Sequence, residues 1–174
     1  MRIAIITTGG TIAKTFDEAS GALFNERPVI ETIVRALRLP DLKIEYRHIL
    51  NKDSLDMTNE DRLTILDSVR EAAITKTADA VVVVHGTDTL ATTGELLQGE
   101  AAELGIPIVL TGAMRPYEFR DSDALQNVTE ALLACRLAEP GVYVAMHNRL
   151  LRFPGVVKDR TSLTFVKPDT AGIR

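Results

Sequence analysis

Residues 80–89 read Ala-Val-Val-Val-Val-His-Gly-Thr-Asp-Thr, and this stretch decides the class of fold. Five apolar residues in a row, four of them valine, favour a strand that is buried on both faces. Strands of this kind are typical of a parallel sheet covered by helices on each side. The polar residues from His85 to Thr89 then mark a loop at the carboxyl end of that strand.

Other short apolar runs repeat this pattern on both sides of residues 80–84. Residues 3–6, 107–110 and 142–146 indicate three further buried strands. Residues 43–49 alternate more regularly between apolar and polar side chains, which indicates an outer strand of the same sheet. The runs therefore predict a sheet that is parallel over most of its width.

Helices are expected between these strands. Their predicted starts are near Pro28, at Thr58, at about Asp88 and at about Ser122, and the last two helices end near Leu104 and Leu137. Thr58 followed by Asp61 is a variant of the capping box. The apolar face of this second helix is predicted from its helical spacing to comprise Leu63, Leu66, Val69 and Ala73.

The order of elements is β-α repeated about four times and then strands. Asn148 is expected in a hairpin turn, with residues 150–152 as the returning strand. Residues 14–27 read as a long loop, and loops of that length often cover sites. The prediction is one α/β domain over residues 1–174, with three αβα layers, a mainly parallel sheet and a C-terminal β-hairpin.

Composition narrows the function classes. The chain has 174 residues, 45% apolar and 25% charged, with a formal net charge of −4. This balance gives no reason to expect nucleic acid or an anionic membrane as a partner, and the longest apolar run is far too short to span a bilayer. The single cysteine, Cys135, cannot form an internal disulfide. A cytoplasmic location is therefore expected.

Three loops rich in small and hydroxyl side chains follow predicted strands. They are residues 7–11, 85–89 and 111–116. Ligands of open α/β sheets bind at the carboxyl ends of the strands, and glycine lets backbone N–H groups approach a ligand closely. Each loop alone fits a tight turn or a helix cap equally well. Three such loops at one edge of a sheet favour a functional site.

The residue types in these loops suggest hydroxyl chemistry. A threonine is a weak nucleophile until a neighbouring group removes its proton, and a carboxylate with a lysine can assist that step. Asp88 follows Thr87 directly, and Lys158 comes late in the chain. Lys158 alone fits a solvated surface lysine better than a catalytic one. His85 fits a packed histidine bonded to the backbone at least as well as a base.

Two of these loops resemble a known family. Residues 8–13, Thr-Gly-Gly-Thr-Ile-Ala, resemble the first signature of the bacterial-type L-asparaginase/glutaminase family, and residues 85–89 resemble its second signature. Further matches lie at residues 53–58, 110–116, 122–127 and 156–158. The resemblance therefore covers nearly the whole chain in order, and it implies the fold of the N-terminal asparaginase domain.

The resemblance also implies an activity and roles for residues. It implies hydrolysis of L-asparagine to L-aspartate and ammonia through a threonine acyl-enzyme, without a metal or organic cofactor. The implied catalytic residues are the nucleophile Thr11 and its supporting group Thr87, Asp88 and Lys158. The implied substrate-binding residues are Ser54, Leu55, Gly86, Asp88 and Ala113. The family's assembly as dimers and tetramers implies a homo-oligomer that acts on a small amino acid.

The sequence departs from the family pattern in several places. Members usually have about twice this length, with a second domain that donates a glutamate to the neighbouring subunit's site. This chain resembles the short single-domain form, and an excised domain is the alternative. The usual lid-loop tyrosine has no clear match, and Phe16 and Phe24 stand near its place. Leu55 replaces a common polar residue. Two alternatives stay open: an amidase for glutamine, a transamidation intermediate or another small amide, and an amino-acid-binding module without turnover.

Overall fold

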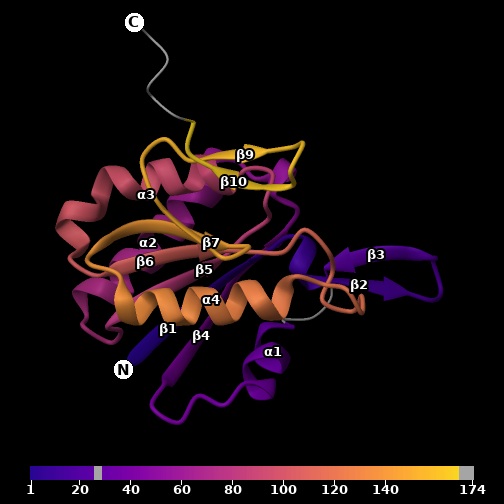
Figure 1. The fold of residues 1–174 in the computed structure, drawn as a ribbon, viewed down its shortest axis with the longest axis horizontal. Coiled ribbons are helices and arrows are strands. Elements are labelled where there is room, and N and C mark those ends of the chain that lie inside the picture. The colour runs from indigo at the N-terminus through magenta and orange to yellow at the C-terminus, as the bar shows by residue number, and fades with distance from the viewer. Residues whose placement is uncertain (26–28, 169–174) are drawn as a thin grey trace, which may run out of the picture.

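The computed structural model describes residues 1–25 and 29–168 (Figure 1). Its main sheet contains β1 (Arg2–Gly9), β4 (Lys43–Lys52), β5 (Ala80–Val84), β6 (Pro107–Thr111), β7 (Gly141–Met146) and β8 (Arg149–Arg152). The α-helices are α1 (Ile30–Ala36), α2 (Asn59–Ile74), α3 (Leu90–Leu104) and α4 (Ala124–Leu137). Two smaller hairpins are β2 (Lys14–Asp17) with β3 (Ala22–Asn25), and β9 (Val157–Asp159) with β10 (Thr164–Val166).

The main sheet has the strand order β4-β1-β5-β6-β7-β8. All neighbouring pairs are parallel except β7 and β8, which confirms a mainly parallel sheet with an antiparallel hairpin after it. The chain runs from β1 outward to β4 and then crosses back to β5 on the other side of β1. This reversal places a topological switch point between β1 and β5, where open α/β sheets bind their ligands.

Each strand sends alternate side chains into two separate cores, as expected for a sheet covered on both faces. Val81 and Val83 join the core with α2 and α3, whereas Ala80, Val82 and Val84 join the core with α1 and α4. All five residues are at most 1% exposed. The three αβα layers predicted from the apolar runs are therefore confirmed (Figure 1).

The position of α4 is unusual for such a fold. The steps β5→β6 and β6→β7 run in the same direction across the sheet, yet α3 and α4 pack on opposite faces. The two crossovers therefore have opposite hands. The connections through α1, α2 and α3 are mutually consistent with the right-handed rule, so β6-α4-β7 is the left-handed one. This crossover brings the start of α4 beside the turn between β7 and β8.

The capping box at the start of α2 is confirmed. The Asp61 backbone N–H donates to the Thr58 hydroxyl at 3.3 Å, and the Asp61 carboxylate accepts the Thr58 N–H at 2.9 Å. The predicted apolar face of this helix is wrong at Leu63, which is 51% exposed. The buried stripe instead contains Ile65, Leu66, Val69 and Ala72. Each residue turns a helix by about 100°, so Leu63 lies well around the helix from that stripe.

The prediction of a loop over residues 14–27 is wrong for residues 14–25, which form the β2–β3 hairpin. The Asp17 carboxylate accepts the N–H groups of Ala19 and Ser20 and so holds the turn, and Gly21 has a φ of 68°. Arg27 lies outside the described residues. So does Pro28, the predicted helix start, and α1 begins at Ile30.

The predicted turn at Asn148 is confirmed. His147 and Asn148 have φ values of 54° and 60° and join β7 to β8, which is the conformation of a type I′ turn. The β9–β10 hairpin that follows was not expected from the sequence, although it carries Lys158. Within residues 1–25 and 29–168, no helix is long and apolar enough to cross a membrane.

Candidate functional site

The three glycine-containing loops meet at the carboxyl ends of β1, β5 and β6. A Cβ atom on Gly10 would lie 2.5 Å from the Gly86 Cα, so the backbones of the first two loops touch. A Cβ atom on Gly112 would lie 2.3 Å from the His85 carbonyl oxygen. The expectation that these loops share one edge of the sheet is confirmed, because β1, β5 and β6 are parallel, and glycine permits their close backbone packing there.

Lys158 reaches this edge from the β9–β10 hairpin. Its Nζ donates to the Thr87 Oγ1 at 2.8 Å and to the Asp88 Oδ1 at 3.0 Å. The Lys158 side chain is 14% exposed, so the interpretation as a solvated surface lysine is wrong. Arg160 approaches the same Asp88 oxygen at 3.7 Å from a largely exposed position. Three sequence-predicted residues, Thr87, Asp88 and Lys158, therefore form one connected group.

Thr11 lies at the start of a short 3-10 turn, Thr11–Ala13, directly after Gly10. Ile12 and Ala13 are buried in the core with α1 and α4, and they anchor the turn. Thr11 itself is half-buried, and its hydroxyl makes no hydrogen bond within the part of the chain that is described. The Gly10–Gly86 contact brings the chain segment of Thr11 against the loop that carries Thr87.

The predicted substrate loop also packs against the second signature. Ser54 is 1% exposed, and a Cβ atom on Gly86 would lie 2.6 Å from the Ser54 Oγ. The Thr89 hydroxyl donates to the Ser54 carbonyl at 2.8 Å. The Ser54 Oγ is buried without a hydrogen-bond partner among the described residues, so its hydrogen-bonding capacity is unused. Leu55, in contrast, is 67% exposed.

The same loop is held to the first hairpin by an ion pair. The Lys14 Nζ donates to the Asp53 Oδ2 at 2.8 Å, and this bond holds the pKa of Asp53 below its ordinary value. The Phe16 N–H donates to the Glu118 carboxylate at 2.8 Å, which links β2 to the loop after β6. Phe16 is 53% exposed. The β2–β3 hairpin therefore connects two of the loops that border the site.

Ala113 is 1% exposed, and both of its neighbours are held from α4. The Asn127 amide donates to the Gly112 carbonyl at 3.0 Å, and the Met114 N–H donates to the Asp123 carboxylate at 3.0 Å. Asp123 and Asn127 lie within residues 122–127, which resemble the family pattern, but their residue types and spacing did not indicate a function. Their contacts depend on α4 beginning beside the β6 loop, which the tertiary fold decides.

His85 is a packed histidine rather than a base. Its Nδ1 donates to the Gly86 carbonyl at 2.8 Å, and its Nε2 accepts from the Thr93 hydroxyl at 2.9 Å. Burial lowers the pKa of His85 to about 4, so the ring is neutral near neutral pH. Since both ring nitrogens are occupied, this residue positions the start of the second signature.

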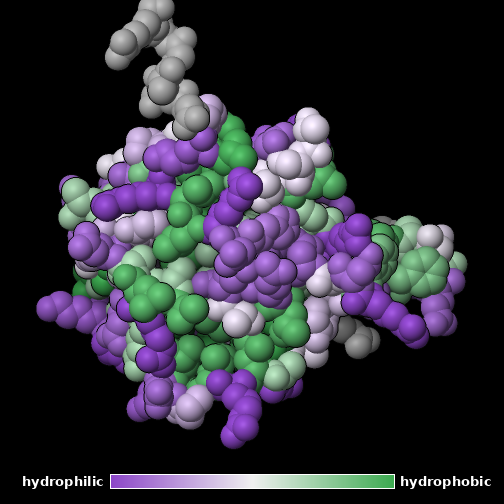
Figure 2. All heavy atoms as spheres, in the orientation of Figure 1, coloured by the Kyte–Doolittle hydropathy of each residue, from purple (hydrophilic) through white to green (hydrophobic). Residues whose placement is uncertain are grey.

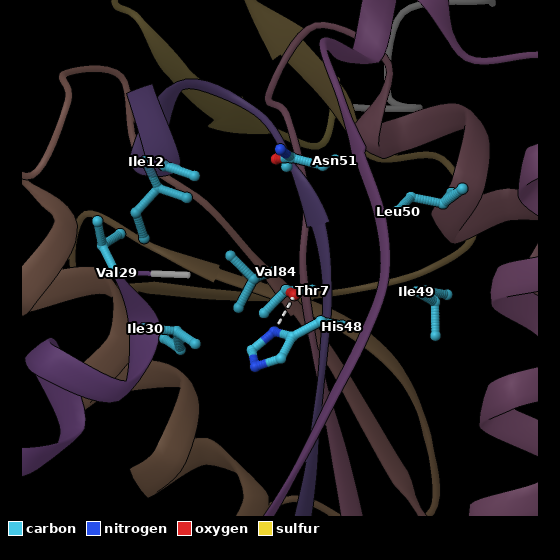
Figure 3. Close-up of a pocket in the computed structure, with 11 residues that line it drawn as sticks. Thr7, Ile12, Val29, Ile30, His48, Ile49, Leu50, Asn51 and Val84 are labelled. Carbon is cyan, nitrogen blue, oxygen red and sulfur yellow. Dashed lines mark hydrogen bonds between the residues drawn. The ribbon is translucent and has the colours of Figure 1, made fainter. Parts of the chain in front are cut away.

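A separate cavity of about 390 Å³ lies on the α1 side of the first loop (Figure 3). It is lined by Thr7, Gly9, Ile12, Ala13, Val29, Ile30, His48, Ile49, Leu50, Asn51 and Val84. Figure 3 shows the His48 ring within it, bonded through Nδ1 to the Thr7 hydroxyl at 2.8 Å. None of the predicted catalytic residues lines this cavity. The side-chain contacts therefore locate the candidate site better than the cavity does.

Comparison with known proteins gives the same assignment as the loops. Residues 2–170 match the family model described as asparaginase, N-terminal. The L-asparaginase of Thermococcus kodakarensis is 38% identical over 151 residues, which cover 87% of this chain and 45% of that protein. A glutamyl-tRNA(Gln) amidotransferase subunit of Methanococcus vannielii is 33% identical over 151 residues, which cover 85% of this chain and 34% of that protein.

Solved structures agree with the fold. The thermostable L-asparaginase from Thermococcus kodakarensis superimposes with a TM-score of 0.85 at 36% identity, over 96% of this chain and 51% of that one. L-asparaginase I from Vibrio cholerae gives a TM-score of 0.81 at 28% identity, again over 96% and 51%. The chain thus spans about half the length of these relatives or less. On the strength of the match over residues 2–170, the chain belongs to the asparaginase family.

Proposed function

We propose that this chain is an L-asparaginase that hydrolyses L-asparagine to L-aspartate and ammonia, with Thr11 as its nucleophile. The observation that carries the proposal is the contact of Lys158 with both Thr87 and Asp88. A partly buried cation that touches a hydroxyl and a carboxylate beside a glycine-rich loop is an arrangement suited to acyl transfer.

The proposed reaction has two halves. The Thr11 Oγ attacks the side-chain amide carbon, the hydroxyl proton passes to the leaving nitrogen, and ammonia departs to leave an ester. A water molecule then adds to the ester carbon, aspartate departs, and the Thr11 oxygen regains a proton. In each half, negative charge develops on the carbonyl oxygen, so nearby backbone N–H groups lower the barrier.

Lys158 would serve this chemistry through Thr87. Because the Lys158 ammonium donates to the Thr87 Oγ1, the Thr87 proton must point to another acceptor, such as an oxygen of the substrate or of a water. The positive charge also favours negative charge developing nearby. We therefore assign Thr87 and Lys158 to proton transfer and charge stabilisation beside Thr11.

The remaining predicted residues would bind the amino acid part of the substrate. The Asp88 carboxylate would hold the α-ammonium group, and the unpartnered Ser54 hydroxyl would bind the α-carboxylate. Gly86 and Ala113 contribute backbone at the floor of the site, where both are buried. We assign the exposed Leu55 to the rim, where an apolar side chain in place of a polar one weakens contact with free amino acids.

The test is ammonia release from L-asparagine by the wild type and by the variants Thr11→Ala and Thr87→Ala. Each variant should lose at least about 100-fold in kcat/KM, as losses of a nucleophile or its support do. Thr92→Ala, at an exposed threonine on α3, is the matched control and should keep the wild-type rate. Near-normal ammonia release by both site variants would refute the assignment.

A second candidate is an amidase that acts on another amide. Two relatives named as subunits of a glutamyl-tRNA(Gln) amidotransferase are 33% identical to this chain. They support glutamine and transamidation intermediates as alternative substrates. Ammonia release from a panel of amides separates this candidate from an asparaginase. A third candidate, a binding module without turnover, predicts heat on titration with aspartate or asparagine and no ammonia from any amide.

We also propose that the chain forms a homo-oligomer in the cytoplasm. Exposed leucines on α4 and β8 gather on one face, where Figure 2 shows apolar side chains along α4. They are Leu133, Leu137 and Leu150, which line one hollow of the surface. An apolar surface of this kind marks contacts with other proteins. Sedimentation at several concentrations tests the assembly, and cell fractionation tests the location, since related proteins are named both cytoplasmic and periplasmic.

A further inference from the structure

A chain of polar contacts joins the Ala113 loop to the hairpin that carries Lys158. The His147 Nε2 lies 2.7 Å from the Asp123 Oδ2, and the His147 Nδ1 lies 3.0 Å from the Thr164 Oγ1. Asp123 belongs to the start of α4, His147 to the β7–β8 turn and Thr164 to β10. Three elements that are distant in sequence therefore meet at one imidazole ring.

The hydrogen-bond roles of this ring follow from its partners. A carboxylate only accepts hydrogen bonds, so the His147 Nε2 carries the proton that faces Asp123. In the neutral ring the Nδ1 then accepts from the Thr164 hydroxyl. His147 is 25% exposed and Asp123 15%, and Thr164 is buried, so solvent competes only weakly for these bonds.

Asp123 is held on its other side by the loop after β6. Its carboxylate accepts the N–H groups of Met114 and Arg115, each at 3.0 Å, and the Asn127 amide at 2.8 Å. Burial alone would raise the pKa of Asp123, but these bonds together with His147 bring its pKa below the ordinary value. The carboxylate is therefore ionised. It binds the loop after β6 through Met114 and Arg115, and it binds the first turn of α4 through Asn127.

Thr164 stands on the strand that pairs with Lys158. In the β9–β10 register Phe165 lies opposite Lys158, and Thr164 lies opposite Asp159. The Phe165 side chain is 1% exposed and packs in the core with α2 and α3. The hairpin is therefore held by an apolar anchor and by two polar contacts: the Thr164 hydroxyl bonded to His147, and the Arg149 guanidinium, which donates to the Phe165 carbonyl at 3.3 Å.

We propose that His147, through Asp123 and Thr164, is a positioning residue that fixes the Lys158 hairpin against the Ala113 loop. Among the described residues, His147 makes no hydrogen bond to Lys158 or to the backbone of the Ala113 loop, so it acts through its two partners. Without the Thr164 bond, β10 would keep the Arg149 bond to the Phe165 carbonyl but lose its attachment to His147, and Lys158 would spend less time on Thr87 and Asp88. The inference rests on the proposed function only for its effect on catalysis.

Thr164→Val and His147→Asn each remove the hydrogen bond between His147 and Thr164, with little change in the size of the side chain and in the shape of the turn, respectively. Thr164→Val replaces the hydroxyl with a methyl group of similar size, and Thr164→Ser keeps the hydroxyl as the conservative rescue. His147→Asn removes the ring but suits the positive φ of this turn, because asparagine tolerates that conformation. Comparison of the three variants separates the hydrogen bond from the shape of the turn and the strand.

The position of Lys158 can be measured without turnover. Acetic anhydride labels lysine amines, and peptide mass spectrometry gives the rate at each lysine. Thr164→Val and His147→Asn should each raise the labelling rate of Lys158 about fivefold to tenfold, the effect of losing one hydrogen bond. Lys52, which is bonded to Asp61 at 2.8 Å on the β4 side, is the internal control and should not change.

The same variants should lower kcat/KM for ammonia release about fivefold to tenfold, and Thr164→Ser should restore both readouts. Unchanged Lys158 labelling in both Thr164→Val and His147→Asn would overturn the proposal. An equal rise at Lys158 and Lys52 would also overturn it, because it would show general loosening. If the wild type released no ammonia from any amide, the proposed function would fail, while the labelling would still decide the role of His147.

Discussion

Replacing Gly10 with alanine places a methyl group against the backbone of the second signature. Its Cβ would lie 2.5 Å from the Gly86 Cα and 2.6 Å from the Gly86 nitrogen. Ordinary van der Waals contacts begin at 3.4 Å, so the two loops must open by about 1 Å. Gly10 also has a φ of 83° and a ψ of −178°, a conformation that side chains avoid.

The cost has two parts. The unfavourable backbone conformation costs about 1–3 kcal/mol, and forcing atoms into a packed contact costs about 1–3 kcal/mol more. Gly21 provides the matched control, because its φ is 68° and a Cβ atom there meets nothing within 4 Å. Gly21→Ala should therefore cost only the conformational part, about 1 kcal/mol. The difference between the two variants therefore contains the close approach of the loops and the more restricted backbone conformation of Gly10.

The assays are urea unfolding and ammonia release from L-asparagine. Gly10→Ala should unfold at lower urea than Gly21→Ala, with a free energy of unfolding lower by about 1–5 kcal/mol. Its ammonia release should fall about 100-fold, since a displacement near 1 Å at a reacting group can cost that much. If the two variants matched in stability and in rate, the packing of Gly10 on Gly86 would not be what brings Thr11 and Thr87 together.

Three further predictions concern other parts of the chain. Lys158→Met should lower ammonia release at least about 100-fold, because it removes the cation bonded to Thr87, and a coupled ammonia assay at equal protein concentration checks this. Burial lowers the pKa of His85 from 6.5 to about 4, so the unfolded chain binds the proton first as the pH falls. The free energy of unfolding should then fall by up to about 3 kcal/mol as the pH is lowered from about 6.5 to 4. A His85→Gln variant should lack this pH dependence in urea titrations. Thr58→Ala should cost about 1 kcal/mol through the lost capping box, whereas the exposed Thr64→Ala should change stability by less than about 0.5 kcal/mol in the same titrations.

The elements of the sheet could be predicted from local patterns. The valines of β5 are buried on both faces because a continuous apolar run has no polar side to turn toward water. The Thr58–Asp61 pair begins α2 because its bonds are local and need no tertiary partner. The loop predicted over residues 14–27 was wrong for residues 14–25 for the converse reason. The β2–β3 hairpin depends on the bonds of Asp17 to its own turn, a signal that mixed composition obscured.

The candidate site could be predicted only in part. The glycines and threonines at residues 8–11 and 85–89 indicated hydroxyl chemistry, because strand ends of a parallel sheet share one edge. Lys158 was interpreted as a surface lysine because its partner, Thr87, lies 71 residues earlier in the chain, and the residues next to Lys158 give no indication of that contact. His147 had no partner pattern for the same reason.

By itself, the sequence determined the buried strands of the main sheet, the order in which they alternate with the helices, and the residue types available at the strand ends. Those features depend on periodicity and on contacts between near neighbours, which the chain carries locally. Only the tertiary structure decided that β1 lies between β4 and β5, and that α4 crosses over with the opposite hand. It also decided that Lys158 and His147 reach the sheet edge from late segments. The physical reason is that these placements follow from how two apolar cores close on both faces of the sheet, and each residue contributes to that packing only through neighbours far away in sequence.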